Sequence, residues 1–143
     1  MKHAFLSILI ISPFFAISQA SQADSIAIRQ ACDNYVGGFY HADTARVAKG
    51  IHPELTKKIV NKRAGDVLQS MPAPDLIKAA GNFKPRDPNP AEPFKLDVFI
   101  YDIASDIATA KIVTNKMPFF DYVQLGKVQG EWKVINVLWA FNK

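Results

Sequence analysis

The chain has 143 residues, which is the size of one domain with one hydrophobic core. Its 17 basic and 13 acidic residues give a formal charge of +4, and the basic residues cluster only at Lys57-Lys58 and Lys62-Arg63. This mild excess at helical spacing is typical of a solvated helix face and argues against a nucleic-acid or anionic-lipid surface, so we expect no nucleic acid as a partner.

Residues 1–20 have the pattern of a secretory signal peptide. A short positive start that contains Lys2 precedes the uncharged apolar run 4–18, which is too short to span a bilayer comfortably. Small residues allow cleavage after Ala20, and a repeat of the same tripeptide allows it after Ala23. We expect a periplasmic or secreted protein without a stable membrane anchor, whose mature part is a single domain over 24–143. An uncleaved N-terminal anchor is the alternative.

A helix is predicted from Asp24 or Ser25 to about Tyr40, because apolar residues recur there at helical spacing. These residues are Ile28, Cys32, Tyr35, Val36 and Phe39. Cys32 is the only cysteine, which excludes an intramolecular disulfide, and its place in the apolar stripe predicts a buried, inert thiol. The pair Gly37-Gly38 indicates either the close approach of another backbone or fraying before a turn.

Three shorter helices are predicted next. Asp43 can cap a helix over 44–49, which Gly50 would close in a left-handed conformation. Pro53 can open a helix to about Arg63, and a further helix is predicted over 74–80. The proline-rich segment 82–93 is predicted to be a loop.

Strand periodicity begins after this loop. Phe94, Leu96, Val98 and Ile100 alternate there with Lys95, Asp97, Phe99 and Tyr101, which is strand periodicity, and further strands are predicted over 107–114, 119–128 and 131–141. The short connections predict antiparallel neighbours. Strict alternation in the last strand places Trp132, Val134 and Leu138 on one face and Ile135, Val137, Trp139 and Phe141 on the other. A sheet that is apolar on both faces is predicted to pair with a second copy or to curve around a cavity. Helices followed by such a sheet indicate an α+β fold.

Several motifs together resemble a known family. They are Tyr35-Val36-Gly37-Gly38-Phe39-Tyr40, Asp43-Thr44-Ala45-Arg46, His52-Pro53-Glu54-Leu55, Ile107-Ala108-Thr109-Ala110-Lys111, Phe120-Asp121-Tyr122 and the run from Gly130 to Trp139. On these motifs, roughly residues 26–139 resemble the putative lumazine-binding family of the nuclear transport factor 2-like superfamily.

The resemblance implies a cone-shaped α+β fold, with N-terminal helices packed on a curved antiparallel sheet and an apolar cavity at the open end. It also implies that the first helix and the inner face of the sheet form the cavity wall. The superfamily contains isomerases, dehydratases, cyclases and binding proteins, so the fold alone does not decide the activity.

Asp121 is the carboxylate with the clearest chemical potential. Strand periodicity places it on the same face as Phe119, Val123 and Leu125, where a carboxylate loses hydration and becomes a candidate general acid or base. In ketosteroid isomerase-like relatives an aspartate moves the proton, and Tyr35, Tyr122 or His52 could supply the accompanying donor. The alternative is a structural network in which Asp121 accepts hydrogen bonds from the backbone or from a tyrosine.

The candidate pocket residues are therefore Tyr35, His52, Asp121, Tyr122 and Trp139. Trp139 is a core or dimer-surface residue that could also stack on a planar ligand, and His52 could cap backbone groups in its turn instead of facing a pocket. His41 and Asp43 form a His-x-Asp pair without a third ligand at metal spacing, so we expect no metal.

Three functions follow from these observations. The favoured one is a binding protein for a small apolar or planar molecule, and no phosphate loop or dinucleotide glycine pattern occurs, so no cofactor is expected. The second is a cofactor-independent acid–base isomerase or dehydratase that uses Asp121. The third is a dimeric interaction module that pairs through its sheet.

Overall fold

The computed structural model describes residues 20–85 and 89–142, with side chains described from residue 22. Three helical segments form one N-terminal rod: α1 (Ala20–Cys32), the π-helical segment η1 (Asp33–Gly37) and α2 (Gly38–Tyr40). Two further helices follow, α3 (Thr44–Gly50) and α4 (Ala73–Gly81). The predicted helices over 24–40, 44–49 and 74–80 are thus confirmed, although the π-helical interruption was not predicted. The signal-peptide prediction concerns residues 1–20 and falls almost wholly outside the described part.

The strands of the described part form a six-stranded sheet in the order β2-β1-β6-β5-β4-β3. The strands are β1 (Ile51–Asn61), β2 (Val67–Pro72), β3 (Leu96–Ala104), β4 (Ile107–Thr114), β5 (Phe119–Val128) and β6 (Glu131–Phe141). The predicted bounds of β4, β5 and β6 are confirmed. The prediction of a purely antiparallel sheet needs correction, because β1 runs parallel to β6 while the other neighbours are antiparallel.

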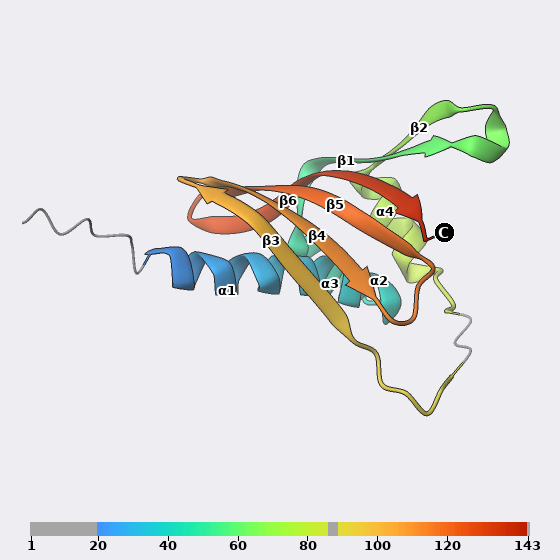
Figure 1. Cartoon of the computed structure of the whole chain (residues 1–143), viewed down its shortest axis with the longest axis horizontal. Coiled ribbons are helices and arrows are strands. Elements are labelled where there is room, and N and C mark those ends of the chain that lie inside the picture. Colours follow the sequence, from blue (N-terminus) through green and yellow to red (C-terminus); the bar gives the residue numbers. More distant parts are fainter. Residues whose placement is uncertain (1–19, 86–88, 143) are drawn as a thin grey trace, which may run out of the picture.

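The predicted helix from Pro53 to Arg63 is wrong, since this segment is strand β1. The β-branched residues Thr56, Ile59 and Val60 favour extended backbone. The strand also pairs on both sides, with β2 and with β6. Asn61 caps the turn by accepting a hydrogen bond from Arg63 N at 3.0 Å, and the turn ends at Gly65 with φ 86°. The β1–β2 hairpin extends beyond the body of the molecule (Figure 1).

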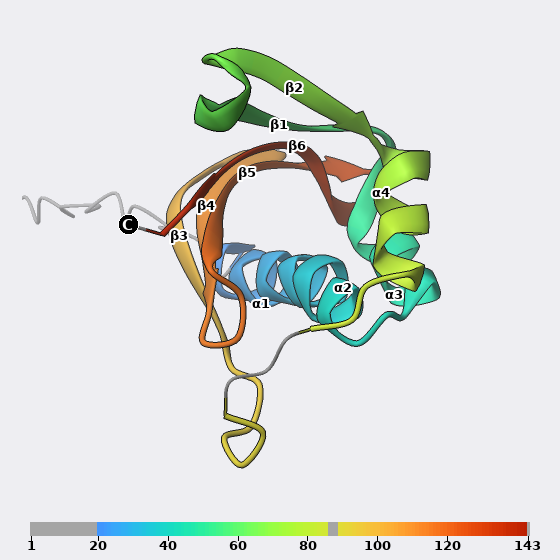
Figure 2. The same ribbon diagram turned by 90° about the vertical axis from the view of Figure 1, so that its right-hand side faces the viewer.

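The sheet curves around the N-terminal helical rod (Figure 2). Helices α3 and α4 pack at one end of this rod. The core lies between the rod and the concave face of the sheet, and its largest fully buried side chains include Ile28, Tyr35, Leu76, Ile112 and Leu125. Cys32 lies in this core as predicted, and burial raises the pKa of its thiol to about 12, which makes it a poor nucleophile.

An irregularity in β6 corrects the predicted faces of that strand. The β5–β6 register shifts at Gln124/Leu125, so that Gln124 pairs with Asn136 whereas Leu125 pairs with Val134. One extra residue in β6 lets Val134 and Val137 both face the core, which strict alternation forbids. Leu138 consequently lies on the exposed face and Trp139 turns inward.

Two glycines hold α3 against the N-terminal rod. A Cβ at Gly38 would lie 2.9 Å from Val47 N, which supports the close approach of another backbone over fraying, the two alternatives for the glycine pair. A Cβ at Gly50 would lie 2.5 Å from Tyr35 N and 2.6 Å from Ala31 O. The expectation that Gly50 adopts a left-handed cap is wrong, because the positive-φ glycines of the described part are Gly65 and Gly130. Gly50 is required for close packing.

Helices on the concave face of a curved, mixed sheet make this an α+β cone, as the sequence predicted. Within residues 20–85 and 89–142, no helix has the length and apolar character needed to cross a membrane.

Candidate functional site

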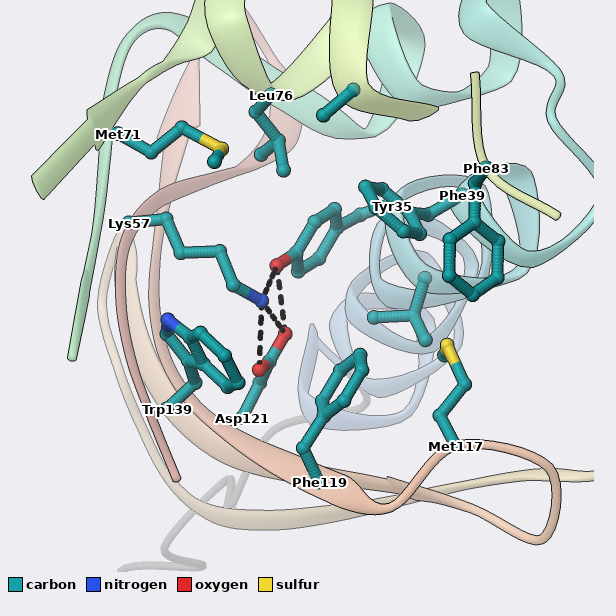
Figure 3. A pocket seen from close by; sticks show the side chains of 12 residues that line it. Tyr35, Phe39, Lys57, Met71, Leu76, Phe83, Met117, Phe119, Asp121 and Trp139 are labelled. Atoms are coloured by element: carbon teal, nitrogen blue, oxygen red, sulfur yellow. Dashed lines mark hydrogen bonds and ion pairs between the residues drawn. The ribbon is translucent and has the colours of Figure 1, made fainter. Parts of the chain in front are cut away.

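A cavity of about 220 Å³ lies between the helical rod, α4 and the concave face of the sheet, and residues of all three line it. Most of its wall is apolar: Val36, Phe39, Met71, Leu76, Ala79, Phe83, Met117, Phe119 and Trp139. Three polar side chains complete the wall, and they are Tyr35, Lys57 and Asp121 (Figure 3). A largely apolar wall with a few converging polar groups is the usual composition of a small-molecule site.

The three polar residues form one closed cluster. Tyr35 Oη donates to Asp121 Oδ2 at 2.7 Å. Lys57 Nζ donates to Tyr35 Oη at 2.7 Å and lies 2.9 Å from both carboxylate oxygens of Asp121. Asp121 is only 1% exposed and the Lys57 side chain 11%, so this ion pair is withdrawn from water. Buried charges of this kind are tolerated only when they are paired and hydrogen-bonded.

Aromatic rings surround the Lys57 ammonium. Its Nζ lies 5.1 Å from the ring centroids of both Phe119 and Trp139, and 5.4 Å from that of Tyr35. Figure 3 shows the lysine side chain reaching between these rings toward Asp121. The rings of Phe119 and Trp139 attract the positive charge, which adds to the stabilisation that Asp121 provides, while Tyr35 contacts the ammonium through its hydroxyl.

Each polar side chain is positioned by a specific feature of the fold. Tyr35 lies in the middle of the π-helical segment η1, where Gly50 packs against its backbone nitrogen. Asp121 and Trp139 are directly opposite each other on β5 and β6. Lys57 comes from β1, whose parallel pairing with β6 places it opposite Val137. Because π-helical turns cost stability and occur often at functional sites, the placement of Tyr35 supports a functional role for the cluster.

Burial shifts the pKa values of two members of the cluster. The pKa of Tyr35 is raised well above its usual 10.0, chiefly by burial and also by the charge of Asp121 and its hydrogen bond. Burial lowers the pKa of Lys57 below 10.5, and the Asp121 carboxylate opposes that shift. Both shifts follow from the cost of placing a charge in an apolar cavity.

The raised pKa of Tyr35 predicts a loss of stability at alkaline pH. Above pH 10 the unfolded chain releases the Tyr35 proton while the folded chain keeps it, so the free energy of unfolding falls as pH rises. Lys57 acts in the opposite direction below pH 10.5, because the folded chain releases that proton first. In an alkaline titration followed by tyrosinate absorbance, we expect one tyrosine to ionise only when the chain unfolds, and Tyr35→Phe to remove that step.

Tyr122→Phe is the matched control for this titration, since it removes a phenol from the exposed face of the sheet. It should leave the step at unfolding unchanged. A Tyr35 phenol that titrates in the folded chain together with the other tyrosines would show that the cluster is open to solvent.

The structure brings three of the five candidate residues together. Tyr35, Asp121 and Trp139 line the cavity. His52 lies at the start of β1 outside it, where its Nδ1 accepts a hydrogen bond from Glu54 N at 3.2 Å. This contact corresponds to the second alternative for His52, in which the side chain caps a backbone group in its turn. Tyr122 is also outside the cavity, because neighbouring strand residues face opposite sides, and this residue is 44% exposed beside Tyr101 on the outer face.

Sequence reasoning missed Lys57. It was placed on a solvated helix face, whereas the structure places it on a strand with its ammonium in the cavity. The available signal was the spacing of Leu55, Lys57 and Ile59, which share one face if the segment is extended. A lysine on an apolar face needs a buried acidic partner.

The sequence comparison decides the family. The family described as Putative lumazine-binding matches residues 23–140. The chain belongs to this family. The cavity and its Tyr35–Lys57–Asp121 cluster lie within the matched part of the chain. A comparison with curated proteins gave no match.

Solved structures share the fold at low sequence identity. An NTF2-like protein of unknown function from Shewanella baltica OS155 is 22% identical, with a TM-score of 0.74 over 88% of this chain and 99% of that chain. A ketosteroid isomerase-like protein from Erwinia carotovora atroseptica SCRI1043 is 12% identical, with a TM-score of 0.57 over 82% and 95% of the two chains. A putative scytalone dehydratase from Novosphingobium aromaticivorans DSM 12444 is 11% identical, with a TM-score of 0.57 over 86% and 87%. These similarities establish the NTF2-like fold of this family member.

The cluster limits the chemistry that the cavity can perform. Asp121 is engaged by an ammonium and a phenol, so its charge is compensated before any ligand enters. No three His, Cys, Asp or Glu side chains of the described residues gather in a way that could hold a metal ion. The cavity therefore combines a mainly apolar wall with one charge-compensated polar cluster.

Proposed function

We propose that this chain is an exported protein that binds a compact, mainly apolar ring molecule in the cavity. The observation that carries the proposal is the cavity itself, an apolar wall with a single compensated polar cluster. An apolar cavity of about 150 Å³ is enough for benzene, so about 220 Å³ admits a substituted ring or a small fused pair. The description of the family, Putative lumazine-binding, supports a small planar ligand. Export rests on the signal-peptide pattern of residues 1–20.

The proposal includes a homodimer that forms through the outer face of the sheet. Large apolar side chains are exposed on this face, among them Phe99, Tyr101, Tyr122 and Leu138. Exposed apolar surface of this kind is typical of an interaction site. Pairing through the convex face leaves the cavity free, because the residues that line the cavity lie on the concave side of the sheet and on the helices.

Native mass spectrometry of the mature protein, purified gently from its export compartment, tests both parts. We expect a dimer mass and a bound small molecule of defined mass. Ala79→Phe, which fills the cavity from α4, should lose the bound molecule, whereas Ala64→Phe at the exposed hairpin turn should retain it. Circular dichroism of both variants checks that they are folded. Equal occupancy in the two variants, or a ligand-free wild-type protein, would contradict binding in this cavity.

An acid–base isomerase or dehydratase is the second candidate function. The hydrogen bond from Tyr35 Oη to a buried carboxylate favours it, as do structural neighbours described as ketosteroid isomerase-like and as a putative scytalone dehydratase. The Lys57 ammonium argues against it, since a carboxylate that is held by a cation is a weaker base. Conversion of the bound molecule by the wild-type protein, abolished by Asp121→Asn, would favour the enzyme.

A further inference from the structure

We propose that the cavity selects planar ring molecules without hydrogen-bonding groups, such as aromatic hydrocarbons, and discriminates against polar heterocycles. The inference rests on the proposed binding function and specifies the chemical class of its ligand. It follows from two features of the wall: its polar side chains are shielded by their own contacts, and the rest of its surface consists of hydrocarbon, aromatic rings and thioethers.

The polar side chains of the wall offer little to a ligand. Tyr35 and Asp121 are each 1% exposed, and no buried side-chain nitrogen or oxygen of the described residues lacks a partner. The Lys57 ammonium contacts the oxygens of Tyr35 and Asp121 at 2.7 and 2.9 Å. The rings of Phe119 and Trp139 also pack against it, with both centroids 5.1 Å from Nζ (Figure 3). The cluster therefore holds the fold together beside the cavity and presents almost none of its polar surface to a ligand.

The backbone of the wall is also engaged. Apart from Phe83 and Met117, the wall residues belong to helices or strands, whose backbone groups pair mainly with one another. Phe83 N donates to Ala80 O at 3.0 Å, and Met117 N donates to Thr114 Oγ1 at 3.1 Å. A carbonyl, ring nitrogen or N–H group of a ligand thus loses its bonds to water without replacement. Each such group should weaken binding by about tenfold.

The apolar wall favours flat rings. Two pairs of aromatic side chains border the cavity: Phe39 and Phe83, with ring centroids 4.8 Å apart, and Phe119 and Trp139, with centroids 5.4 Å apart. An aromatic guest can make the same tilted and edge-to-face contacts with these rings. The thioethers of Met71 and Met117 line the cavity as well, and sulfur packs favourably against aromatic ring edges.

Three planar fused-ring probes of similar size test this inference on the wild-type protein at pH 6, where all three are uncharged. Naphthalene has no hydrogen-bonding group, and quinoxaline has two accepting ring nitrogens. Lumazine has two carbonyls, two N–H groups and two further ring nitrogens. Dissociation constants come from ligand-observed NMR after any co-purified molecule is removed. We expect naphthalene to bind about 100-fold more tightly than quinoxaline, and lumazine to show no measurable binding.

Partition of the same probes from water into cyclohexane provides the reference, because cyclohexane forms no hydrogen bonds. The affinity ratios should follow the partition ratios. A cavity with an accessible hydrogen-bonding group would instead bind quinoxaline or lumazine more tightly than partition predicts, by about fivefold or more.

A matched pair of variants on β2 locates the selectivity at the wall. Met71→Gln places an amide donor at the cavity, so the preference for naphthalene over quinoxaline should shrink by about fivefold. Leu68→Gln makes a similar change on the same strand, at an exposed residue that does not line the cavity, and should retain the full preference. Circular dichroism checks that both variants are folded. Equal preferences in the two variants would overturn the inference.

The outcomes separate this inference from the proposed function. Lumazine or quinoxaline binding as tightly as naphthalene, or a polar heterocycle as the co-purified molecule, would overturn the selectivity and leave small-molecule binding intact. A cavity that takes none of the three probes and carries no co-purified molecule would contradict the binding function and the selectivity together.

Discussion

Replacing Lys57 by methionine is expected to lower the free energy of unfolding by about 3–5 kcal/mol at pH 7. Methionine preserves most of the apolar stem, so the loss comes from the charge. Without the ammonium, the Asp121 carboxylate stays buried at 1% exposure with Tyr35 as its remaining side-chain partner. An uncompensated charge in an apolar site is among the costliest defects that a single substitution can create. Urea unfolding measured on the wild type and the variant gives the value.

Two further variants determine whether the charge is the cause. Lys57→Met combined with Asp121→Asn removes both charges, and we expect it to recover a large part of the stability that Lys57→Met loses, since the penalty belongs to the orphaned carboxylate. Lys62→Met breaks an ion pair with Asp66 that is 83% and 65% exposed, and it should change stability by less than about 0.5 kcal/mol. If Lys57→Met were as mild as Lys62→Met, the buried ion pair would not exist in solution.

Replacing Gly50 by alanine is expected to cost about 1–3 kcal/mol and to displace Tyr35 from the cluster. The added methyl would lie 2.5 Å from Tyr35 N and 2.6 Å from Ala31 O, and both atoms are backbone. Neither can rotate away, so the N-terminal rod or α3 must shift. Urea unfolding measures the cost, and alkaline titration of the variant shows whether Tyr35 ionises before the chain unfolds.

Gly81→Ala is the control for this substitution. Its new methyl would meet only Thr44 Cγ2, at 3.0 Å, and a side chain can give way by a few tenths of an ångström. Alanine also favours the helix in which Gly81 lies. We expect a change of less than about 1 kcal/mol. Equal costs at the two glycines would mean that Gly50 does not hold the π-helical segment in place.

Local patterns were sufficient to predict much of the fold. Period-two alternation with short turns gave the bounds of β4, β5 and β6, and it placed Asp121 on the inner face. The capping role of Asp43 was also predictable, because its side chain accepts from Arg46 N at 3.0 Å as an N-cap should. In these segments, local preference and tertiary packing favour the same structure.

The features that failed to be predicted depend on distant partners. The segment 51–61 is extended because β6 and β2 pair with it, and β6 lies about eighty residues away in sequence. The extra residue in β6 is needed only to keep Val134 and Val137 both in the core. The π-helical turn at Tyr35 depends on packing against Gly50. Short-range periodicity contains none of this information.

Only part of the candidate site could be predicted, because local patterns identify some of its residues and distant strand pairing determines the others. Asp121 and Tyr35 could be chosen because each sits in a clear apolar pattern, and they meet at 2.7 Å. Lys57 could not be chosen, since its role depends on whether its segment is a helix or a strand. With Lys57 present, the structural-network alternative for Asp121 gains support over the free acid–base group.

The most direct test of the proposed function is a crystal structure of the natively purified protein, at a resolution that distinguishes a ring from a water cluster. We expect a compact ring-shaped molecule between Trp139 and Phe39, with the Lys57–Asp121 ion pair intact. A cavity that contains only water, or that is closed by the protein's own side chains, would contradict the proposal that this protein binds a small molecule there.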